Sequence, residues 1–225
     1  MLYIVATPIG NLDDISPRAI SVLNSSDLIL AEDTRVTRAL LSRYNIGRPL
    51  LSYHQHSKVK KIDEIVALLK NGKTLSLVSD AGTPGINDPG NFLIQEILKE
   101  LPDLKIIPIP GPNAAITALS ISGFPADKFV FLGFPPHKKG RQTFFKKIGD
   151  MEDIVVFYES KHRILKALEE LKELANLQAR PVVVARELTK QFETIYRGTV
   201  SEIMLTLSGH KDNTLGEFVV VIGPK

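Results

Sequence analysis

The chain alternates short apolar runs with longer segments in which apolar residues recur every three or four positions. Short apolar runs bounded by turn residues are typical of buried strands, and the longer repeat is typical of amphipathic helices. Helical stripes of this kind are predicted at residues 62–69 and 164–171. Strands are predicted at residues 2–6, 28–31, 74–78, 105–109, 129–132, 154–158, 181–185 and 217–222.

This alternation predicts an α/β fold with largely parallel strands in the first half of the chain. Ser16 followed by Pro17 predicts the start of a helix, because serine caps a helix N-terminus and proline fits its first position. The stretch PIPGPNAA at 108–115 holds three prolines and a glycine, which interrupt regular structure. We therefore predict two domains, an N-terminal α/β domain at 1–111 and a C-terminal α/β domain at 112–225.

The amino-acid composition excludes several classes of protein. The 225 residues are 44% hydrophobic and 24% charged with a net charge of +3, which is typical of a globular protein that permits an anionic partner without requiring one. The absence of cysteine excludes a disulfide scaffold and a cysteine nucleophile and fits a reducing cytoplasm. No apolar run approaches the roughly 20 residues that span a bilayer, and no basic leader precedes the first strand. We expect a cytoplasmic location and no membrane partner.

Three loops that follow predicted strands are rich in glycine, proline and small polar residues. They are ATPIGNLDD at 6–14, SDAGTPGINDPG at 79–90 and PGPNAA at 110–115. Open α/β sheets bind ligands beyond the carboxyl ends of their strands, and glycine with proline gives a stiff backbone that a ligand can approach closely. The loops therefore predict a preformed binding site. The alternative is that glycine and proline only form tight turns here.

These loops argue against a phosphorylated ligand. The glycines of GINDPG at 85–90 have P-loop spacing, but Asn and Phe follow where Lys and Ser or Thr are required. Residues 79–90 contain no Lys or Arg, whereas Asp80 and Asp88 favour a ligand with positive charge or hydrogen-bond donors. The chain also shows no G-x-G-x-x-G after a strand, no G-x-S-x-G and no histidine spacing that suits a metal.

Seven segments form a recognisable set, which in chain order is VATPIGNLDDIS, AEDTR, SDAGTPGINDPG, PIPGPNA, FLGFPPHKKGR, YESKHR and RELTKQFE. In order and spacing they resemble the ribosomal RNA small subunit methyltransferase I family of the tetrapyrrole-methylase superfamily. The resemblance implies two α/β domains of the tetrapyrrole-methylase type with S-adenosylmethionine in a cleft between them, usually in a homodimer. It also implies 2′-O-methylation of a cytidine ribose in small-subunit (16S) rRNA, so the implied partner is that rRNA or the 30S subunit.

The resemblance implies a set of cofactor-binding residues as well. They are Ile9 and Gly10 against the cofactor, Asp80 and Thr83 at its ribose or methionine part, Asn113 and Ala114 on its far side, and Tyr158 and Arg186 after strands of the second domain. S-adenosylmethionine carries a sulfonium and an ammonium but no phosphate. Loops with acidic residues and no lysine cluster agree with that chemistry.

Methyl transfer to a ribose hydroxyl requires an in-line approach and loss of the hydroxyl proton. The candidates are Asp33 or Glu187 as the base, and Lys190 or Arg35 as the cation that stabilises the forming alkoxide. Two alternatives stay open. Asp33 caps a helix that begins near Thr34 while Arg35 faces solvent, and RELTKQFE forms a salt-bridge network or a solvated loop.

A basic stretch, PPHKKGRQTFFKK at 135–147, predicts an RNA contact. Lys138, Lys139 and Arg141 are the residues expected to neutralise phosphates. The alternative is a solvated lysine-rich helix face with Phe144 and Phe145 in the core.

Two other functions stay open at this point. A tetrapyrrole C-methyltransferase would keep the cofactor and change the acceptor, and a non-catalytic RNA-binding module would keep the cleft only as a scaffold. Family members often continue with a short C-terminal segment, whereas this chain ends at VVVIGPK. Such an ending is typical of a shortened chain in which RNA contacts from that segment would be missing.

Overall fold

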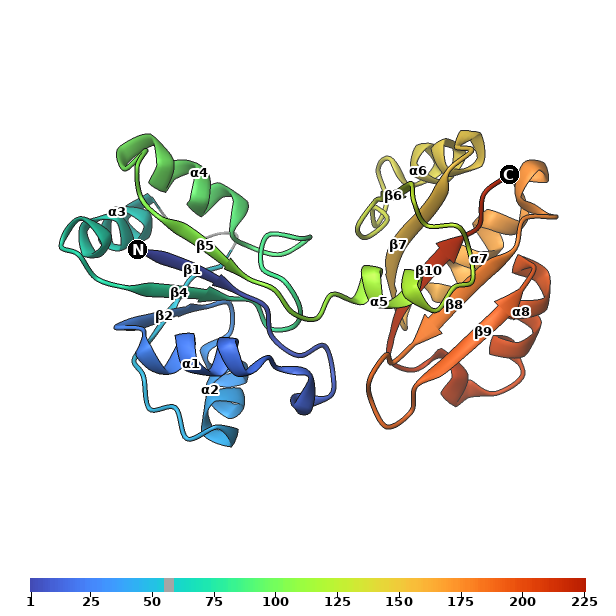
Figure 1. The fold of residues 1–225 in the computed structure, drawn as a ribbon. Helices are drawn as coiled ribbons and strands as arrows, with labels where there is room; N and C mark the ends of the chain where they lie inside the picture. The colour runs from blue at the N-terminus through green and yellow to red at the C-terminus, as the bar shows by residue number, and fades with distance from the viewer. Residues whose placement is uncertain (55–58) are drawn as a thin grey trace. The chain divides into compact units, whose positions relative to one another are not determined.

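The computed structural model of the protein is described for residues 1–54 and 59–225. Its contacts divide the chain into two units, Met1–Asn113 and Ala114–Lys225, and Figure 1 labels the elements of each. This division lies close to the predicted domain boundary.

The first unit is a five-stranded parallel sheet with helices on both faces. Its strand order is β3-β2-β4-β1-β5, and the parallel pairing agrees with the prediction from the sequence. Helices α3 and α4 pack on one face, and α1 and α2 pack on the other (Figure 1). The elements are β1 (Leu2–Val5), α1 (Pro17–Ser25), β2 (Leu28–Ala31), α2 (Thr34–Arg43), β3 (Leu50–Ser52), α3 (Val59–Lys70), β4 (Leu75–Val78), α4 (Asn91–Glu100) and β5 (Ile106–Ile109).

The strands of this sheet read as unbroken apolar runs because helices cover both faces. In β2, Leu30 faces the core with α3 and α4, while Ile29 and Ala31 face the core with α1 and α2. Helix α1 begins as predicted, with Pro17 in its first turn and the Ser16 hydroxyl accepting the N–H of Ala19 at 3.0 Å.

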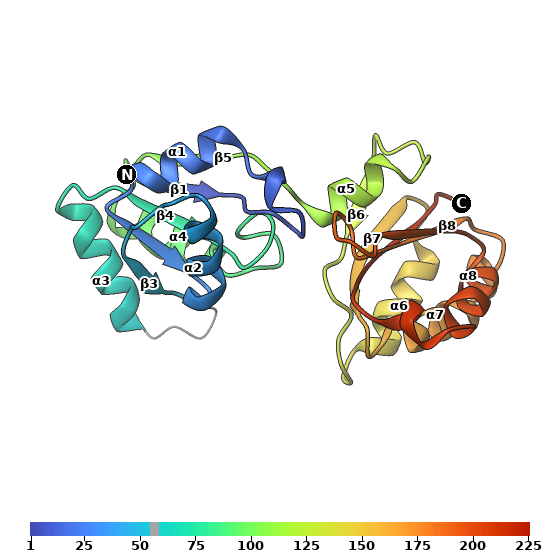
Figure 2. The same cartoon turned by 90° about the horizontal axis from the view of Figure 1, so that it is seen from below.

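The second unit is a mixed sheet with strand order β6-β7-β10-β8-β9. Strands β6 and β7 are parallel, and the other pairs are antiparallel. Helices α6, α7 and α8 enclose its main core on one face, and Figure 2 shows α5 on the other. The elements are α5 (Ala114–Ser120), β6 (Phe129–Phe131), α6 (Arg141–Asp150), β7 (Ile154–Ser160), α7 (Ile164–Lys172), β8 (Val182–Arg186), β9 (Thr194–Gly198), α8 (Val200–Ser208) and β10 (Glu217–Ile222).

The predicted α/β class is confirmed, and all eight predicted strands are present with ends that differ by at most about two residues. The sequence did not predict β3 and β9, which are both edge strands. Strand β3 has only three residues, and the sequence of β9, TIYRG, contains too few apolar residues to stand out. No helix within the described ranges is both long enough and apolar enough to cross a membrane.

The cap of α1 gives a test of this local structure. We expect Ser16→Ala to lower the free energy of unfolding by about 1 kcal/mol, because the N–H of Ala19 loses its acceptor. Urea denaturation followed by circular dichroism measures the change. Ser21→Ala is the matched control, since Ser21 is exposed in the middle of the same helix and alanine is the better helix former there. Equal destabilisation by the two substitutions would contradict the capping role.

Candidate functional site

The three predicted loops lie at the carboxyl edge of the first sheet and are bonded to one another. Thr7 and Gly82 exchange two main-chain hydrogen bonds, of 2.9 and 3.1 Å, across the loops after β1 and β4. The Thr7 hydroxyl also donates to the Ser79 carbonyl at 3.1 Å. Thr83 donates its hydroxyl proton to the Pro112 carbonyl at 3.1 Å, which ties in the loop after β5. The loops therefore form one stiff main-chain frame, called the loop frame below.

Two glycines in the loop frame are required by its geometry. A Cβ on Gly111 would lie 2.9 Å from the Cβ of Ala6, so only glycine allows the loops after β1 and β5 to approach this closely. Gly82 has a φ of +84°, a backbone conformation that other residues rarely adopt. The frame contains the predicted cofactor residues Ile9, Gly10, Asp80, Thr83 and Asn113, whereas Ala114 is the first residue of the second unit.

Three carboxyl groups gather in and beside the loop frame. Glu32 follows β2, and Asp80 and Asp88 lie in the loop after β4. The main-chain N–H of Asp33 donates to the Asp80 carboxylate at 3.0 Å. The N–H of Asp80 in turn bonds to Glu32. Among the described residues these carboxylates do not form a group that could hold a metal ion.

The environment raises the pKa of two of these acids. Burial and then the negative charge of Asp80 raise the pKa of Glu32. Burial, then the charge of Glu32, raises the pKa of Asp88 to about 6, although a hydrogen bond from the Ser79 hydroxyl opposes the rise. The sequence placed Asp88 among ligand-attracting residues but gave no signal for its high pKa. Three carboxyl groups close together make this edge of the sheet a site that favours positive charge.

Asp33 and Arg35 have the arrangement predicted as the alternative to a catalytic role, in which Asp33 caps a helix and Arg35 faces solvent. Asp33 caps α2 by accepting the N–H of Arg35 at 2.8 Å, and the Arg35 guanidinium pairs with the same carboxylate at 2.6 Å. The Arg35 side chain is 89% exposed. Hydrogen bonds from the side chain and the backbone of Arg35 lower the pKa of Asp33 to about 2. A carboxylate with so low a pKa is a poor acceptor for a hydroxyl proton.

The turn after β8 is strained and closed by ion pairs. Glu187 and Thr189 have φ values of 51° and 64°, which are unusual for residues other than glycine. Glu187 accepts hydrogen bonds from the Lys190 ammonium at 3.0 Å and from the N–H of Glu217 at 2.9 Å. Lys190 also pairs with the Glu217 carboxylate at 2.8 Å. The salt-bridge alternative for RELTKQFE is therefore present in the structure.

These contacts keep both charges in place. Burial favours the neutral form of Glu187, but the hydrogen bonds from Lys190 and from the backbone of Glu217 outweigh it and lower its pKa. Burial likewise opposes the charge of Lys190, and its bonds to Glu217 and Glu187 prevail and raise its pKa. The lowered pKa makes Glu187 a weaker base, so the ion pair suits charge stabilisation better than proton removal.

Tyr158 and Arg186 contact the main chain of the second unit. The Tyr158 hydroxyl accepts the N–H of Ala115 at 3.2 Å. Arg186 is buried, and its guanidinium donates to the carbonyls of Leu215 at 2.6 Å and Phe192 at 3.4 Å. Their role as cofactor ligands stays a prediction.

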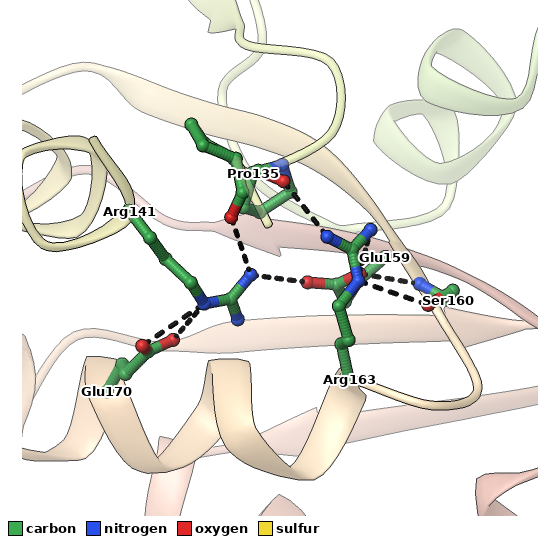
Figure 3. Close-up of polar contacts among 7 residues, drawn as sticks. Pro135, Arg141, Glu159, Ser160, Arg163 and Glu170 are labelled. Atoms are coloured by element: carbon green, nitrogen blue, oxygen red, sulfur yellow. Dashed lines mark hydrogen bonds and ion pairs between the residues drawn. The ribbon is translucent and has the colours of Figure 1, made fainter. Parts of the chain in front are cut away.

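The basic stretch divides into exposed lysines and a buried arginine. Lys138 and Lys139 are exposed in the loop between β6 and α6. Arg141 is only 4% exposed and pairs with Glu159 and Glu170 (Figure 3). The prediction that Arg141 binds RNA phosphate is therefore wrong, because its guanidinium is enclosed by protein carboxylates. Phe145 is in the core, as the alternative for this stretch expected.

Comparison with known proteins places this architecture in a family. The model of the tetrapyrrole (corrin/porphyrin) methylases matches residues 1–204. The chain is 45% identical to a protein of Thermotoga maritima, with 100% of this chain and 98% of the relative covered. It is also 45% identical to a protein of Escherichia coli O157:H7, with 98% and 77% covered. Both relatives are named ribosomal RNA small subunit methyltransferase I.

Solved structures share the fold at low identity. The methyltransferase CobJ superposes with a TM-score of 0.70 at 19% identity, covering 99% of this chain and 93% of that one. Diphthine synthase superposes with a TM-score of 0.71 at 14% identity, covering 99% and 89%. The fold is thus shared with the methyltransferase CobJ and with diphthine synthase, whose sequences are distant from this one. From the family match and the full-length relatives, the chain belongs to the tetrapyrrole methylase family and, within it, to the ribosomal RNA small subunit methyltransferase I family.

Proposed function

We propose that the protein transfers a methyl group from S-adenosylmethionine to the 2′-hydroxyl of a cytidine in small-subunit (16S) ribosomal RNA. The observation that carries the proposal is the 45% identity over the whole chain to relatives named for methylation of that RNA. CobJ, the cobalt precorrin-4 methyltransferase CbiF and a uroporphyrin-III C-methyltransferase share only 17–19% identity with this chain, which favours RNA over a tetrapyrrole as the acceptor. Family resemblance alone supports a homodimer and a cytoplasmic location.

The loop frame fits S-adenosylmethionine better than it fits a phosphorylated nucleotide. Bound there, the cofactor would supply an electrophilic methyl group on a sulfonium. The frame offers a stiff main chain and, in Asp80 and Asp88, negative charge. It offers no lysine or arginine between residues 79 and 90. A cation with an adenine and an ammonium is the ligand that this donor set favours.

The residues of the second unit would position and stabilise the acceptor. Lys190 is the group that we assign to the oxygen that gains charge, because its ion pairs keep it protonated at neutral pH. Glu187 holds Lys190 in place through a strained turn, and strain of this kind is common at functional sites. Lys138 and Lys139 would neutralise RNA phosphates.

Methyl transfer to defined acceptors tests the proposed function. We expect labelled methyl from S-adenosylmethionine to appear on 30S subunits and to map to a cytidine ribose, with no transfer to a tetrapyrrole precursor. Label on the tetrapyrrole would make the protein a C-methyltransferase. Calorimetry that detects no binding of S-adenosylmethionine would favour a non-catalytic RNA-binding module. Either result would overturn the proposal.

Substitution of Lys190 tests the assignment of charge stabilisation. We expect Lys190→Ala to lower kcat about 100-fold or more while the Kd for S-adenosylmethionine stays within about twofold, because the lost contact acts on the forming alkoxide. Lys190→Arg should recover part of the rate. Lys211→Ala, at an exposed lysine in the same unit, is the control and should leave kcat unchanged. An unchanged kcat in a folded Lys190→Ala protein would exclude the role.

Substitution of Asp88 by Asn should raise the stability of the fold at pH 8 and weaken the binding of S-adenosylmethionine. Its pKa is raised from 3.8 to about 6, so the carboxyl stabilises the fold when protonated, and that stability is lost as the pH rises from about 4 through 6. The change corresponds to about 3 kcal/mol before screening, and we expect about 1 kcal/mol because solvent reaches the carboxyl. Asp88→Asn should therefore be the more stable protein at pH 8, with no difference from the unsubstituted protein at pH 4.

The same substitution should weaken the binding of S-adenosylmethionine at pH 8, because it removes a negative charge beside the loop frame. Urea denaturation and calorimetry at pH 4 and pH 8 measure the two effects. Asp103→Asn, at an exposed aspartate of the same unit, should change neither quantity. A destabilised Asp88→Asn protein at pH 8 would show that the carboxylate is a favourable part of the fold and contradict this account.

A further inference from the structure

The loop that carries the exposed lysines is fixed at both ends. It comprises residues 133–140, GFPPHKKG, and connects β6 to α6. At its start, the main-chain N–H of Tyr158 donates to the Gly133 carbonyl at 2.9 Å. At its end, the N–H of Arg141 donates to the Lys138 carbonyl at 3.2 Å, and Gly140 enters α6 with a φ of +86°. Below it is called the lysine loop.

The middle of the lysine loop depends on side chains from outside it. Pro135 and Pro136 have no N–H to donate, but their carbonyls remain acceptors. Arg163 donates to the Pro135 carbonyl at 3.2 Å, and Arg141 donates to the Pro136 carbonyl at 3.3 Å. Two consecutive carbonyls of the loop are therefore held by two arginines that follow it in the chain.

A buried carboxylate links these two arginines. The Glu159 side chain is 0% exposed, and its two oxygens pair with Arg141 at 3.3 Å and with Arg163 at 2.9 Å (Figure 3). The N–H of Ser160 donates to the same carboxylate at 2.8 Å. The Glu170 carboxylate accepts a hydrogen bond from the Nε of Arg141, also at 2.8 Å. Arg141, Glu159, Arg163 and Glu170 are called the buried ion network below. Its two positive and two negative charges balance.

Stability alone does not account for the buried ion network. Taking charges out of water costs several kcal/mol per ion, and packed apolar residues often stabilise a fold as well as a buried ion pair does. Within the described part of the chain, the Nη2 of Arg141 is buried without a hydrogen-bond partner, which adds a further cost. What the network provides that apolar residues would not is directed donors to the carbonyls of Pro135 and Pro136.

The lysine loop presents groups that suit RNA. Lys138 and Lys139 are exposed, and Phe134 is 47% exposed with its ring 5.4 Å from that of Tyr158. Lysines that neutralise phosphates and an exposed ring on which a base can stack are the two features of single-stranded RNA sites. If the loop is already ordered before RNA arrives, binding does not have to provide the free energy of ordering it.

We propose that Glu159, Arg141 and Arg163 are positioning residues for RNA binding, which hold the lysine loop in its RNA-binding conformation through the carbonyls of Pro135 and Pro136. The proposal rests on the proposed function, since it assumes that Lys138 and Lys139 contact the rRNA. The three residues act through the loop and do not themselves touch the RNA.

Arg163→Ala is the variant that tests the proposal, because it removes the donor to Pro135 and leaves Arg141 paired with both Glu159 and Glu170. We expect the KM for 30S subunits to rise about tenfold, since the ordering of two lysines then opposes binding. The kcat at saturating 30S and the Kd for S-adenosylmethionine should stay within about twofold. Trypsin should cleave the native variant faster after Lys138 and Lys139. Arg163→Lys should restore part of the affinity.

Arg197→Ala is the matched control. Arg197 lies in the same unit, carries the same charge and donates to the main-chain carbonyl of Ile121 at 2.7 Å, outside the lysine loop. It should leave the KM for 30S subunits and the tryptic pattern unchanged. Equal effects of Arg163→Ala and Arg197→Ala would mean that only net charge matters, and would overturn the proposal.

A double-substitution cycle separates this proposal from the function on which it rests. Lys138→Ala with Lys139→Ala should weaken 30S binding, and adding Arg163→Ala should then raise the KM by much less than about tenfold, because only Phe134 is left in the loop to position. Additive losses would overturn the positioning role and leave the RNA contact standing. No loss from the lysine substitutions would instead refute the proposed RNA contact itself. If Arg163→Ala fails to fold, Arg163→Gln in the same cycle decides between these outcomes.

Discussion

The hydrogen-bonded pairing of Thr7 with Gly82 is the contact on which the candidate site depends. It joins the loops that leave β1 and β4, and the Thr83 hydroxyl extends the connection to the Pro112 carbonyl. Because these main-chain groups bond to one another, the loops have little freedom to move apart. A ligand that binds here meets a main chain that is already in place, so little binding free energy goes into ordering the protein. Glycine at position 111 is a consequence, since a Cβ would collide with Ala6.

Charge is distributed so that each unit suits a different part of the proposed reaction. The first unit places Glu32, Asp80 and Asp88 beside its loop frame, which favours a cationic methyl donor. The second unit exposes Lys138 and Lys139, which favour an anionic polymer. The net charge of +3 reveals neither feature, because local groups of negative and positive charge cancel in the total.

Much of the fold could be predicted because its determinants are local in sequence. The apolar run of β4 and the cap at Ser16 are visible within a few residues, and both are present in the structure. The short edge strand β3 and the mixed sequence of β9 carry no such local signal. The three-residue β3 is ordered by its pairing with β2. Pairing with a neighbouring strand is information that the segment itself does not contain.

The candidate site was harder to predict for the same reason. Asp33 and Arg35 are two residues apart, so the capping alternative could be stated from the sequence, and the structure contains it. Arg141 looked like part of a basic patch because the carboxylates that enclose it, Glu159 and Glu170, come from β7 and α7. The high pKa of Asp88 likewise arises from burial and from Glu32, which follows a different strand. Roles set by distant partners require the fold.

The proline-rich loops of both units use one physical device. Proline fixes φ but has no N–H, so a loop that contains it keeps carbonyl acceptors without matching donors. Side chains supply the donors: Thr83 bonds to the carbonyl of Pro112, and Arg163 to that of Pro135. The result is a loop that is stiff without belonging to a sheet or helix, which leaves its other groups free to face a ligand. Sequences that look like simple turns can therefore build binding surfaces when a donor elsewhere in the fold reaches their carbonyls.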